Sequence, residues 1–195
     1  MITSIDQLDH NATYTYADYL KWQIEGYVEL IRGKIFKMAA PTSDHQEISI
    51  SLASKIFVHL SKSDCKVFAA PFDVRLYRFS EKANKEILTV VQPDICVICD
   101  KNKVDIKGCI GAPDLIIEIL SPGNSKKEMK EKFSIYEESG VKEYWIVYPD
   151  EKSILRYILN EHEKFIGLQP LTEDDIINTP ILEGLDIHLS DVFHH

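Results

Sequence analysis

The sequence predicts a mixed α/β (α+β) fold in which helices flank a central mixed sheet. Three observations support this prediction. Two runs rich in β-branched residues, 90–98 and 112–120, are bounded by turn residues, as buried strands are. Apolar side chains recur at helical spacing over residues 45–60 and again over about 126–139. A further apolar strand, 143–148, follows the second helix and ends at a Pro-Asp turn.

Length and composition are those of one globular domain. The chain has 195 residues, of which 45% are hydrophobic and 27% charged, so residues 1–195 suit a single domain with a sizeable core. No apolar run approaches the roughly 20 residues that span a bilayer. Residues 1–6 have neither the basic nor the apolar region of a secretory signal. We therefore expect a cytoplasmic protein with no membrane partner.

The N-terminal part is expected to contain a short helix and a hairpin. Apolar spacing predicts the helix over residues 16–26. Strands at 27–32 and 34–38 flank Gly33, which can supply the positive φ of a hairpin turn. Glu29 shares a face with apolar neighbours on the first strand. It is therefore either a half-buried acid or an edge residue.

His45 stands at the first turn of the helix expected over residues 45–60. It lies on the same side as Ile48 and Leu52, which belong to the apolar stripe of that helix. A helix N-terminus favours a neutral imidazole or a bound anion. His45 is thus either a satisfied structural histidine or a residue that lies over acids of the sheet and contacts phosphate.

Strands and loops are also predicted for the remaining segments of the chain. Residues 66–77 predict one strand interrupted at Pro71. Polar connections are expected at 79–87 and 100–111, and the second carries several lysines that could grip a nucleic-acid backbone. C-terminal strands are expected at 153–159, 164–169 and 187–189.

One acid stands inside each of the two apolar runs, Asp94 in 90–98 and Glu118 in 112–120. An isolated ionised carboxylate is too costly to bury, so such groups are paired, hydrogen-bonded, bound to a metal or neutral. Two of them on neighbouring strands predict a site for a hard divalent cation, Mg²⁺ or Mn²⁺. Asp114 shares a face with Glu118 and could support the metal ligands from behind, but it begins its strand, where capping is the commoner role.

The helix over residues 126–139 is expected to pack on the sheet. A capping box of Ser125 and Glu128 starts it, and Gly140 is suited to end it. Lys132 sits at the edge of its apolar stripe, so the ammonium can reach the acids while the stem covers apolar surface. The alternative is that Lys132 only extends to solvent. The stripe comprises Met129, Phe133 and Tyr136.

The order of these residues resembles known enzymes. Pro93-Asp94, followed by Glu118 in a strand–strand–helix–strand order, is similar to the core of the PD-(D/E)XK nuclease superfamily. From about Tyr16 to the C-terminus, the chain more closely resembles the Uma-two family of restriction endonucleases. The segments that carry this resemblance are 29–33, Pro41 with His45, 92–94, 113–115 with 118–122, Lys132 and 140–145.

The resemblance implies a restriction-endonuclease-like fold with a nuclease core at about residues 45–149. It implies metal-dependent hydrolysis of nucleic-acid phosphodiester bonds, in DNA rather than RNA, and a homodimer. Asp94 and Glu118 would hold the Mg²⁺ or Mn²⁺ ion, with the carbonyl of Ile119 as a further ligand.

Three further catalytic candidates follow from the same resemblance. The superfamily pattern expects a lysine two residues after Glu118, where this chain has Leu120. The resemblance implies that Lys132 substitutes for it, orienting the attacking water or neutralising charge on the phosphate. Glu29 and His45 are the other two candidates.

Two rival functions come from the charge and from the missing strand lysine. A net charge of −9 is unfavourable for binding nucleic acid, because Lys and Arg contacts to phosphate supply most non-specific affinity. A catalytically inactive nuclease-fold module for binding or assembly would fit an acidic chain with Leu120. A metal-dependent hydrolase of a small phosphorylated molecule would also explain the acidity.

The four cysteines are expected to be packed thiols. Cys96 and Cys99 have the spacing of a metal-binding pair, but an odd offset within one strand sends their thiols to opposite faces. No histidine follows at finger-like spacing, so zinc is not expected.

Overall fold

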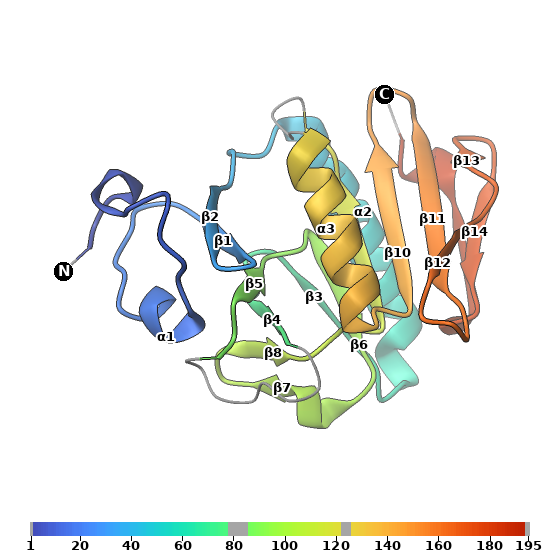
Figure 1. The fold of residues 1–195 in the computed structure, drawn as a ribbon. Helices are drawn as coiled ribbons and strands as arrows, with labels where there is room; N and C mark the ends of the chain where they lie inside the picture. The colour runs from blue at the N-terminus through green and yellow to red at the C-terminus, as the bar shows by residue number, and fades with distance from the viewer. Residues whose placement is uncertain (1, 78–85, 122–125, 194–195) are drawn as a thin grey trace.

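The computed structural model describes residues 2–77, 86–121 and 126–193, and these residues form three sheets (Figure 1). The largest has seven strands in the order β12-β11-β10-β9-β6-β3, with β13 paired to β11. Strands β9 and β10 run parallel and the other pairs are antiparallel, so this sheet is mixed. Its strands are β3 (Lys66–Ala69), β6 (Ile95–Ile98), β9 (Leu115–Ile119), β10 (Glu143–Tyr148), β11 (Ser153–Leu159), β12 (Phe165–Gly167) and β13 (Leu171–Thr172).

The other two sheets come from the first half and the end of the chain. A six-stranded sheet has the order β2-β1-β5-β4-β8-β7, and β14 pairs with β15 in a separate hairpin. Their bounds are β1 (Val28–Ile31), β2 (Lys34–Lys37), β4 (Val74–Leu76), β5 (Thr89–Val91), β7 (Val104–Asp105), β8 (Gly108–Ile110), β14 (Ile176–Thr179) and β15 (Leu182–His188). The α-helices are α1 (Tyr16–Tyr19), α2 (Ser43–His59) and α3 (Lys126–Ser139), and short 3-10 turns lie at Ile5–Gln7, Leu60–Lys62, Lys101–Lys103 and Leu189–Asp191.

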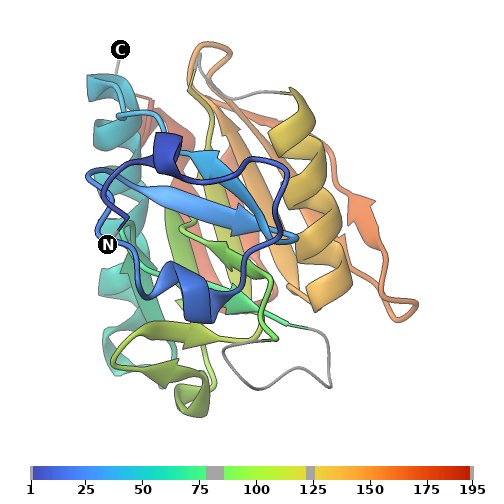
Figure 2. The same ribbon diagram turned by 60° about the vertical axis from the view of Figure 1, so that its left-hand side comes forward.

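Helices α2 and α3 cover opposite faces of the seven-stranded sheet (Figure 2). The alternation of strand β9 shows why. Leu115 and Ile117 are buried with the apolar stripe of α2 and with the C-terminal hairpin. Ile116 is buried on the other face with Ile135 and Tyr136 of α3. The predicted mixed α+β fold, with helices flanking a mixed sheet, is therefore confirmed.

The six-stranded sheet packs on the same face of the seven-stranded sheet as α3. Two predicted strands were wrong, because each of these runs divides between the two sheets. Residues 66–77 form β3 and β4, which belong to different sheets on either side of Pro71. Residues 90–98 likewise contain the end of β5 and all of β6, again in different sheets. Asp94 thus stands just before a strand rather than inside one. The sequence reads as continuous because both halves of each run are apolar and β-branched.

Other expectations differ in detail. The predicted helix over 16–26 is the single turn α1, while the loop expected at 100–111 contains a 3-10 turn and the β7–β8 hairpin. The hairpin of β1 and β2 is confirmed, with positive φ at both Arg32 and Gly33. Gly140 has φ of 84° directly after α3, as expected of a helix stop. Ser125 of the predicted capping box lies outside the described residues.

The cysteines correct one prediction. Cys65 and Cys99 form a disulfide between the start of β3 and the end of β6, whereas Cys96 and Cys109 are buried free thiols. Cys96 packs on the α3 face and Cys99 on the α2 face, so the two ends of the Cys96–Cys99 motif do point to opposite sides. Within the described residues, no helix combines the length and the apolar character needed to cross a bilayer.

A buried carboxylate fastens the C-terminal hairpin to the large sheet. Glu143 of β10 is fully buried, and burial raises the pKa of its carboxyl group. Trp145 donates its indole N–H to Glu143 Oε1 over 2.6 Å. The Thr179 hydroxyl of β14 donates to the other oxygen, Oε2. Each oxygen of the acid therefore has a donor, which is what a buried carboxyl group requires.

We expect Thr179→Val to lower the free energy of unfolding by roughly 1–3 kcal/mol, because it leaves Glu143 Oε2 buried without a donor. Urea denaturation measures this loss. Thr172→Val is the matched control, since that exposed hydroxyl bonds only Asp175, and its effect should stay within about 0.5 kcal/mol. Equal losses of unfolding free energy in the two variants would contradict the stabilising role of the Thr179–Glu143 hydrogen bond.

Candidate functional site

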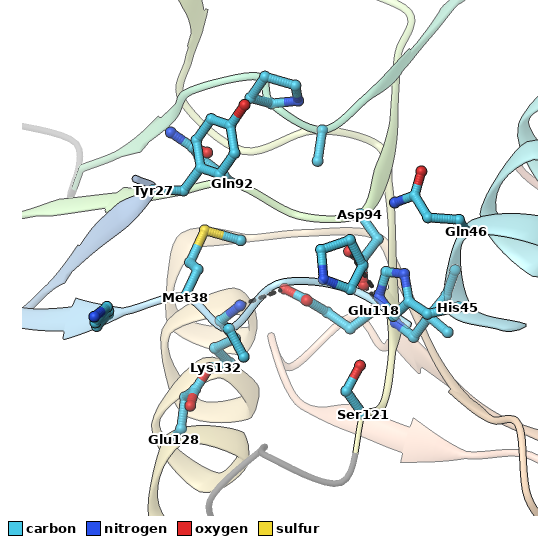
Figure 3. A pocket seen from close by; sticks show the side chains of 16 residues that line it. Tyr27, Met38, His45, Gln46, Gln92, Asp94, Glu118, Ser121, Glu128 and Lys132 are labelled. Atoms are coloured by element: carbon cyan, nitrogen blue, oxygen red, sulfur yellow. Dashed lines mark hydrogen bonds and ion pairs between the residues drawn. The ribbon is translucent and has the colours of Figure 1, made fainter. Parts of the chain in front are cut away.

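A cavity of about 360 Å³ opens where the chain passes from the six-stranded to the seven-stranded sheet (Figure 3). Side chains reach it from several elements. Asp94 comes from the link between β5 and β6, Glu118 from β9, Lys132 from α3 and His45 from the first turn of α2. Four of the five residues predicted from the sequence therefore line one cavity, and Glu29 contacts Lys132 beside it.

Asp94 directly precedes β6, and Glu118 lies on the neighbouring strand β9. Strand β6 pairs with β9 antiparallel, with Ile95 opposite Ile117. One more step in this register sets Asp94 opposite Glu118, on the face away from the α2 core. The Ile119 N–H donates to Asp94 Oδ2 over 2.7 Å, which ties the two strand ends together. The predicted convergence of the two acids thus follows from the strand register.

His45 contacts the second oxygen of Asp94. Its Nε2 lies 3.2 Å from Asp94 Oδ1. The Thr42 hydroxyl caps α2 by accepting the N–H of His45, so the helix begins where the imidazole faces the acids. Burial lowers the pKa of His45, but the hydrogen bond and charge of Asp94, with the charge of Glu118, outweigh burial and raise it. The structure thus places His45 against an acid of the site, and its contact with phosphate stays a prediction.

Lys132 is buried between two carboxylates. Its Nζ lies 3.0 Å from Oε1 of Glu118 and 3.0 Å from Oε1 of Glu29. Burial disfavours the ammonium, but the two negative charges outweigh it and hold the pKa of Lys132 well above its usual range. The alternative in which Lys132 extends to solvent is therefore wrong: the side chain is 8% exposed and contacts both acids.

Glu118 is the most perturbed acid of the site. Burial raises its pKa to about 7, and the charges of Asp94 and Glu29 add to the rise. Lys132 and the Tyr136 hydroxyl work in the other direction. Tyr136 donates to Glu118 Oε1 over 2.5 Å, so the same oxygen receives both Tyr136 and Lys132.

Glu29 supports the lysine from the other sheet. It is fully buried on β1, so neither a half-buried nor an edge position describes it. Its Oε1 accepts the Gln92 N–H over 2.8 Å in addition to the Lys132 ammonium. Its Oε2 is buried without a hydrogen-bond partner among the described residues. Such an atom costs free energy unless it binds something in the working protein.

Two residues of the site were not singled out from the sequence. Tyr136 was predicted only as part of the apolar stripe of α3, although its position one helical turn after Lys132 sets both side chains on one face. Gln92 lines the cavity and is 6% exposed. The sequence around Gln92 does not indicate this position, because its hydrogen-bond partners Tyr19 and Asp73 are distant in sequence.

Asp114, the acid that directly precedes β9, stands apart from the site. It accepts the Cys99 N–H over 2.7 Å and pairs with Lys142 at 2.6 Å. Both partners lie at the end of the strand remote from Glu118. Asp114 therefore caps and connects strand ends, which was the commoner of the two roles considered for it.

The donor set fits a hard cation. Among the described residues, no group of three or more His, Cys, Asp and Glu side chains is arranged to hold a metal ion by itself. Mg²⁺, however, is usually bound through one or two carboxylates, with water and substrate phosphate completing the shell. Asp94 and Glu118, facing each other beside the backbone of Ile119 in an accessible cavity, match that pattern.

Known proteins resemble this chain in sequence and in fold. The model of the Uma2 family, described as "Putative restriction endonuclease", matches residues 16–190. The uncharacterized protein slr1290 of Synechocystis sp. is 28% identical over 122 residues, which is 61% of this chain and 60% of that relative. The chain thus matches about three fifths of the length of this curated relative.

A solved structure shares the fold. The crystal structure of "a putative nuclease belonging to DUF820" from Anabaena variabilis has a TM-score of 0.72 and 21% sequence identity. The match covers 92% of this chain and 97% of that chain. At this identity the likeness concerns the fold alone. Together with the family model, it confirms the fold and the family that the sequence predicts.

The raised pKa of Glu118 gives a pH dependence with a definite sign. The folded state holds the Glu118 proton up to about pH 7, whereas the unfolded chain releases it near 4.5. Ionising Glu118 between these values therefore costs the folded state free energy, at most about 3 kcal/mol. Stability from this group is fully present below pH 4.5 and is lost as pH rises through 7.

We expect Glu118→Gln to gain stability relative to the natural protein as pH rises from 5 to 8, by roughly 1–3 kcal/mol in EDTA. Urea denaturation of both proteins at both pH values isolates Glu118 and the groups that its charge affects, because the titrations of all other groups cancel in the difference. Glu143→Gln, measured in parallel, shows how a buried acid outside the cavity behaves. A stability difference that does not change with pH would contradict the prediction.

Proposed function

The chain belongs to the Uma2 family, and on this premise we propose that it is a metal-dependent nuclease that hydrolyses phosphodiester bonds, in DNA rather than RNA. The observation that carries the proposal is the buried arrangement of Lys132 with Glu118 and Glu29 at a cavity that Asp94 also lines. Burying one ammonium and two carboxylates beside the partly buried Asp94 is costly, and a stable core would be easier to build from apolar residues. Such a cluster beside a cavity supports a chemical role.

Asp94 and Glu118 are the residues that would hold a divalent cation, Mg²⁺ or Mn²⁺, with the Ile119 carbonyl as a further oxygen ligand. When bound, the cation would polarise the scissile phosphate and lower the pKa of an attacking water. The N–H of Ile119 fixes one oxygen of Asp94, and Tyr136 fixes one oxygen of Glu118. These contacts limit the rotation of both carboxylates and so hold the ligand atoms in place.

Lys132 acts in this proposal as a fixed positive charge. Because its pKa is raised, it stays an ammonium at neutral pH and does not accept a proton. It can therefore stabilise negative charge that develops on the phosphoryl oxygens, or donate a hydrogen bond that orients the attacking water. Glu29 holds the ammonium from the opposite side and is a positioning residue.

Two further cations at the cavity can contact the phosphate. His45 has a raised pKa and lies against Asp94, so its protonated form carries positive charge into the site. Lys37 is exposed at the end of β2 and lines the same cavity. Arg32, by contrast, is paired with Glu131 and Glu138 of α3. The cavity thus carries the cationic side chains of Lys37 and Lys132 beside the acids Asp94, Glu118 and Glu128, in a chain whose net charge is −9.

A cleavage assay tests the proposal. Supercoiled, linear and single-stranded DNA are incubated with the protein and Mg²⁺ or Mn²⁺ at low salt. We expect cleavage that EDTA abolishes, and Asp94→Asn, Glu118→Gln and Lys132→Met should each lower its rate by roughly 10²-fold or more, the scale of a lost acid/base or charge-stabilising group. Circular dichroism of each variant separates lost chemistry from lost folding.

Two variants outside the cavity are the controls. Asp114→Asn removes the acid that directly precedes β9, and Lys142→Met removes its lysine partner, so neither should change the rate more than about twofold. DNA binding without cleavage would favour an inactive binding module. Hydrolysis of p-nitrophenyl phosphate, with DNA left intact, would favour a small phosphorylated substrate.

We also propose that the protein forms a homodimer through the outer face of α2. Ile50, Phe57 and Val58 are 66%, 67% and 70% exposed on that face, with the small Ser54 between them. A two-fold axis that packs α2 against its copy in antiparallel orientation would join these apolar side chains. It would also bring exposed Glu47 of one chain toward exposed Lys62 of the other, which gives the pair complementary charges.

Sedimentation at micromolar concentration should give a mass near twice 22.4 kDa. Phe57→Glu should shift the equilibrium to the monomer, because the contact would bury a carboxylate without a partner. Ile166→Glu is the control, since Ile166 is an apolar residue on β12 that is also exposed, at 52%. A monomer for the natural protein, or a dimer that survives Phe57→Glu, would exclude this interface.

A further inference from the structure

One wall of the cavity carries no residue of the proposed metal and phosphate site. It is formed by Tyr27 before β1, Met38 after β2, Pro71 between β3 and β4, and Gln92 between β5 and β6. Tyr27, Met38 and Gln92 lie on the side of the cavity away from Ser121 (Figure 3). Three of these side chains are large and apolar or aromatic, and the fourth is an amide.

The amide of Gln92 is fixed with its oxygen free. Its Nε2 donates to Asp73 Oδ1 over 2.9 Å and to the Tyr19 hydroxyl over 3.3 Å. Because a carboxylate only accepts hydrogen bonds, this contact fixes which end of the amide is nitrogen. Gln92 Oε1 is then a buried acceptor with no hydrogen-bond partner among the described residues. An acceptor held in this way is suited to an N–H donor of a ligand.

Tyr27 differs from the buried Gln92 in that it is a large aromatic residue and is 54% exposed. It lines the same cavity as Gln92, and the side chains of Met38 and Pro71 complete the apolar surface beside it. An exposed aromatic face at the rim of a polar cavity is what single-stranded nucleic-acid sites use to stack a base. A Tyr ring provides this surface at little cost in conformational freedom.

We propose that this wall binds one unstacked nucleobase of the substrate, next to the phosphate that Lys132 and Lys37 contact beside the proposed cation site. The base stacks on Tyr27 and donates an N–H to Gln92 Oε1. The inference rests on the proposed nuclease function and deepens it, because it names single-stranded or locally unpaired DNA as the substrate. A cavity of about 360 Å³ has room for one sugar-phosphate and one base rather than for stacked base pairs.

The proposal makes Gln92 a specificity residue. A site built to bond an N–H group rejects a ligand that lacks one, because its own buried acceptor is then left unpaired. Bases that present an amine or imide N–H are expected to bind, and unsubstituted purine is expected to bind poorly. Tyr27 adds affinity for any base, because every base has a face that can stack.

The first experiment tests whether Tyr27 and one base of the bound strand contribute to the same contact. Binding of a fluorescent single-stranded oligodeoxynucleotide is measured by anisotropy in EDTA, with each nucleotide in turn replaced by an abasic unit. We expect one position at which the abasic unit weakens binding by roughly tenfold. Tyr27→Ala should weaken binding of the intact strand by a similar factor, and Tyr27→Phe should not. In Tyr27→Ala the abasic unit at that position should cost nothing further, which shows that the two groups act together.

The second experiment tests Gln92. At the position found above, adenine is replaced by unsubstituted purine, and binding by the natural protein should weaken by about fivefold or more. Gln92→Met keeps the volume of the side chain but removes the acceptor, so it should bind both bases equally. Ile166→Ala, which removes an exposed apolar residue far along the chain, controls for surface changes.

Three outcomes would overturn the inference: no sensitive position, additive losses for Tyr27→Ala and the abasic unit, or tighter binding of duplex than of single strands. The readout is binding, so it is independent of the cleavage assay. Cleavage with no sensitive position would leave the nuclease and remove the base pocket. A sensitive position without cleavage would leave the pocket and remove the proposed hydrolysis.

Discussion

The structure around the cavity depends on the burial of the Lys132 ammonium. Its two carboxylate partners come from different sheets, Glu29 from the six-stranded and Glu118 from the seven-stranded sheet, while the lysine comes from the helix α3. A buried ammonium without a partner is strongly destabilising, so the three elements have to meet where the charges meet. The same contact joins the two sheets and positions the carboxylate of Glu118 beside Asp94.

The parts of the site that could be predicted from the sequence are those with a local signal. Asp94 and Glu118 interrupt apolar runs, and the period of two along a strand is enough to place Glu118 on one face. The period of 3.6 residues along α3 sets Lys132 on the edge of the apolar stripe, within reach of the sheet. The fold class followed in the same way from alternating apolar patterns. Whether these residues act in catalysis stays a prediction.

The parts that could not be predicted depend on contacts between distant segments. An apolar, β-branched run does not indicate to which sheet each half belongs, so the change of sheet at Pro71 and between β5 and β6 was missed. That second change is what brings Gln92 into the cavity, where its role depends on Asp73, nineteen residues earlier in the chain. The disulfide of Cys65 and Cys99 was missed for the same reason, since only the pairing of β3 with β6 sets the two cysteines opposite each other.

The position of the lysine on a helix has a physical consequence. A lysine at position 120 would be held by the strand that carries Glu118, whereas Lys132 is positioned only if α3 is docked on both sheets. Arg32, at the turn between β1 and β2, bonds Glu138 at 2.7 Å and Glu131 at 3.4 Å. Exposed pairs such as these contribute little free energy, but they hold the hairpin that carries Glu29 against the helix that carries Lys132. The position of the Lys132 ammonium is therefore set by the packing of α3. A change in that packing moves this positive charge within the cavity.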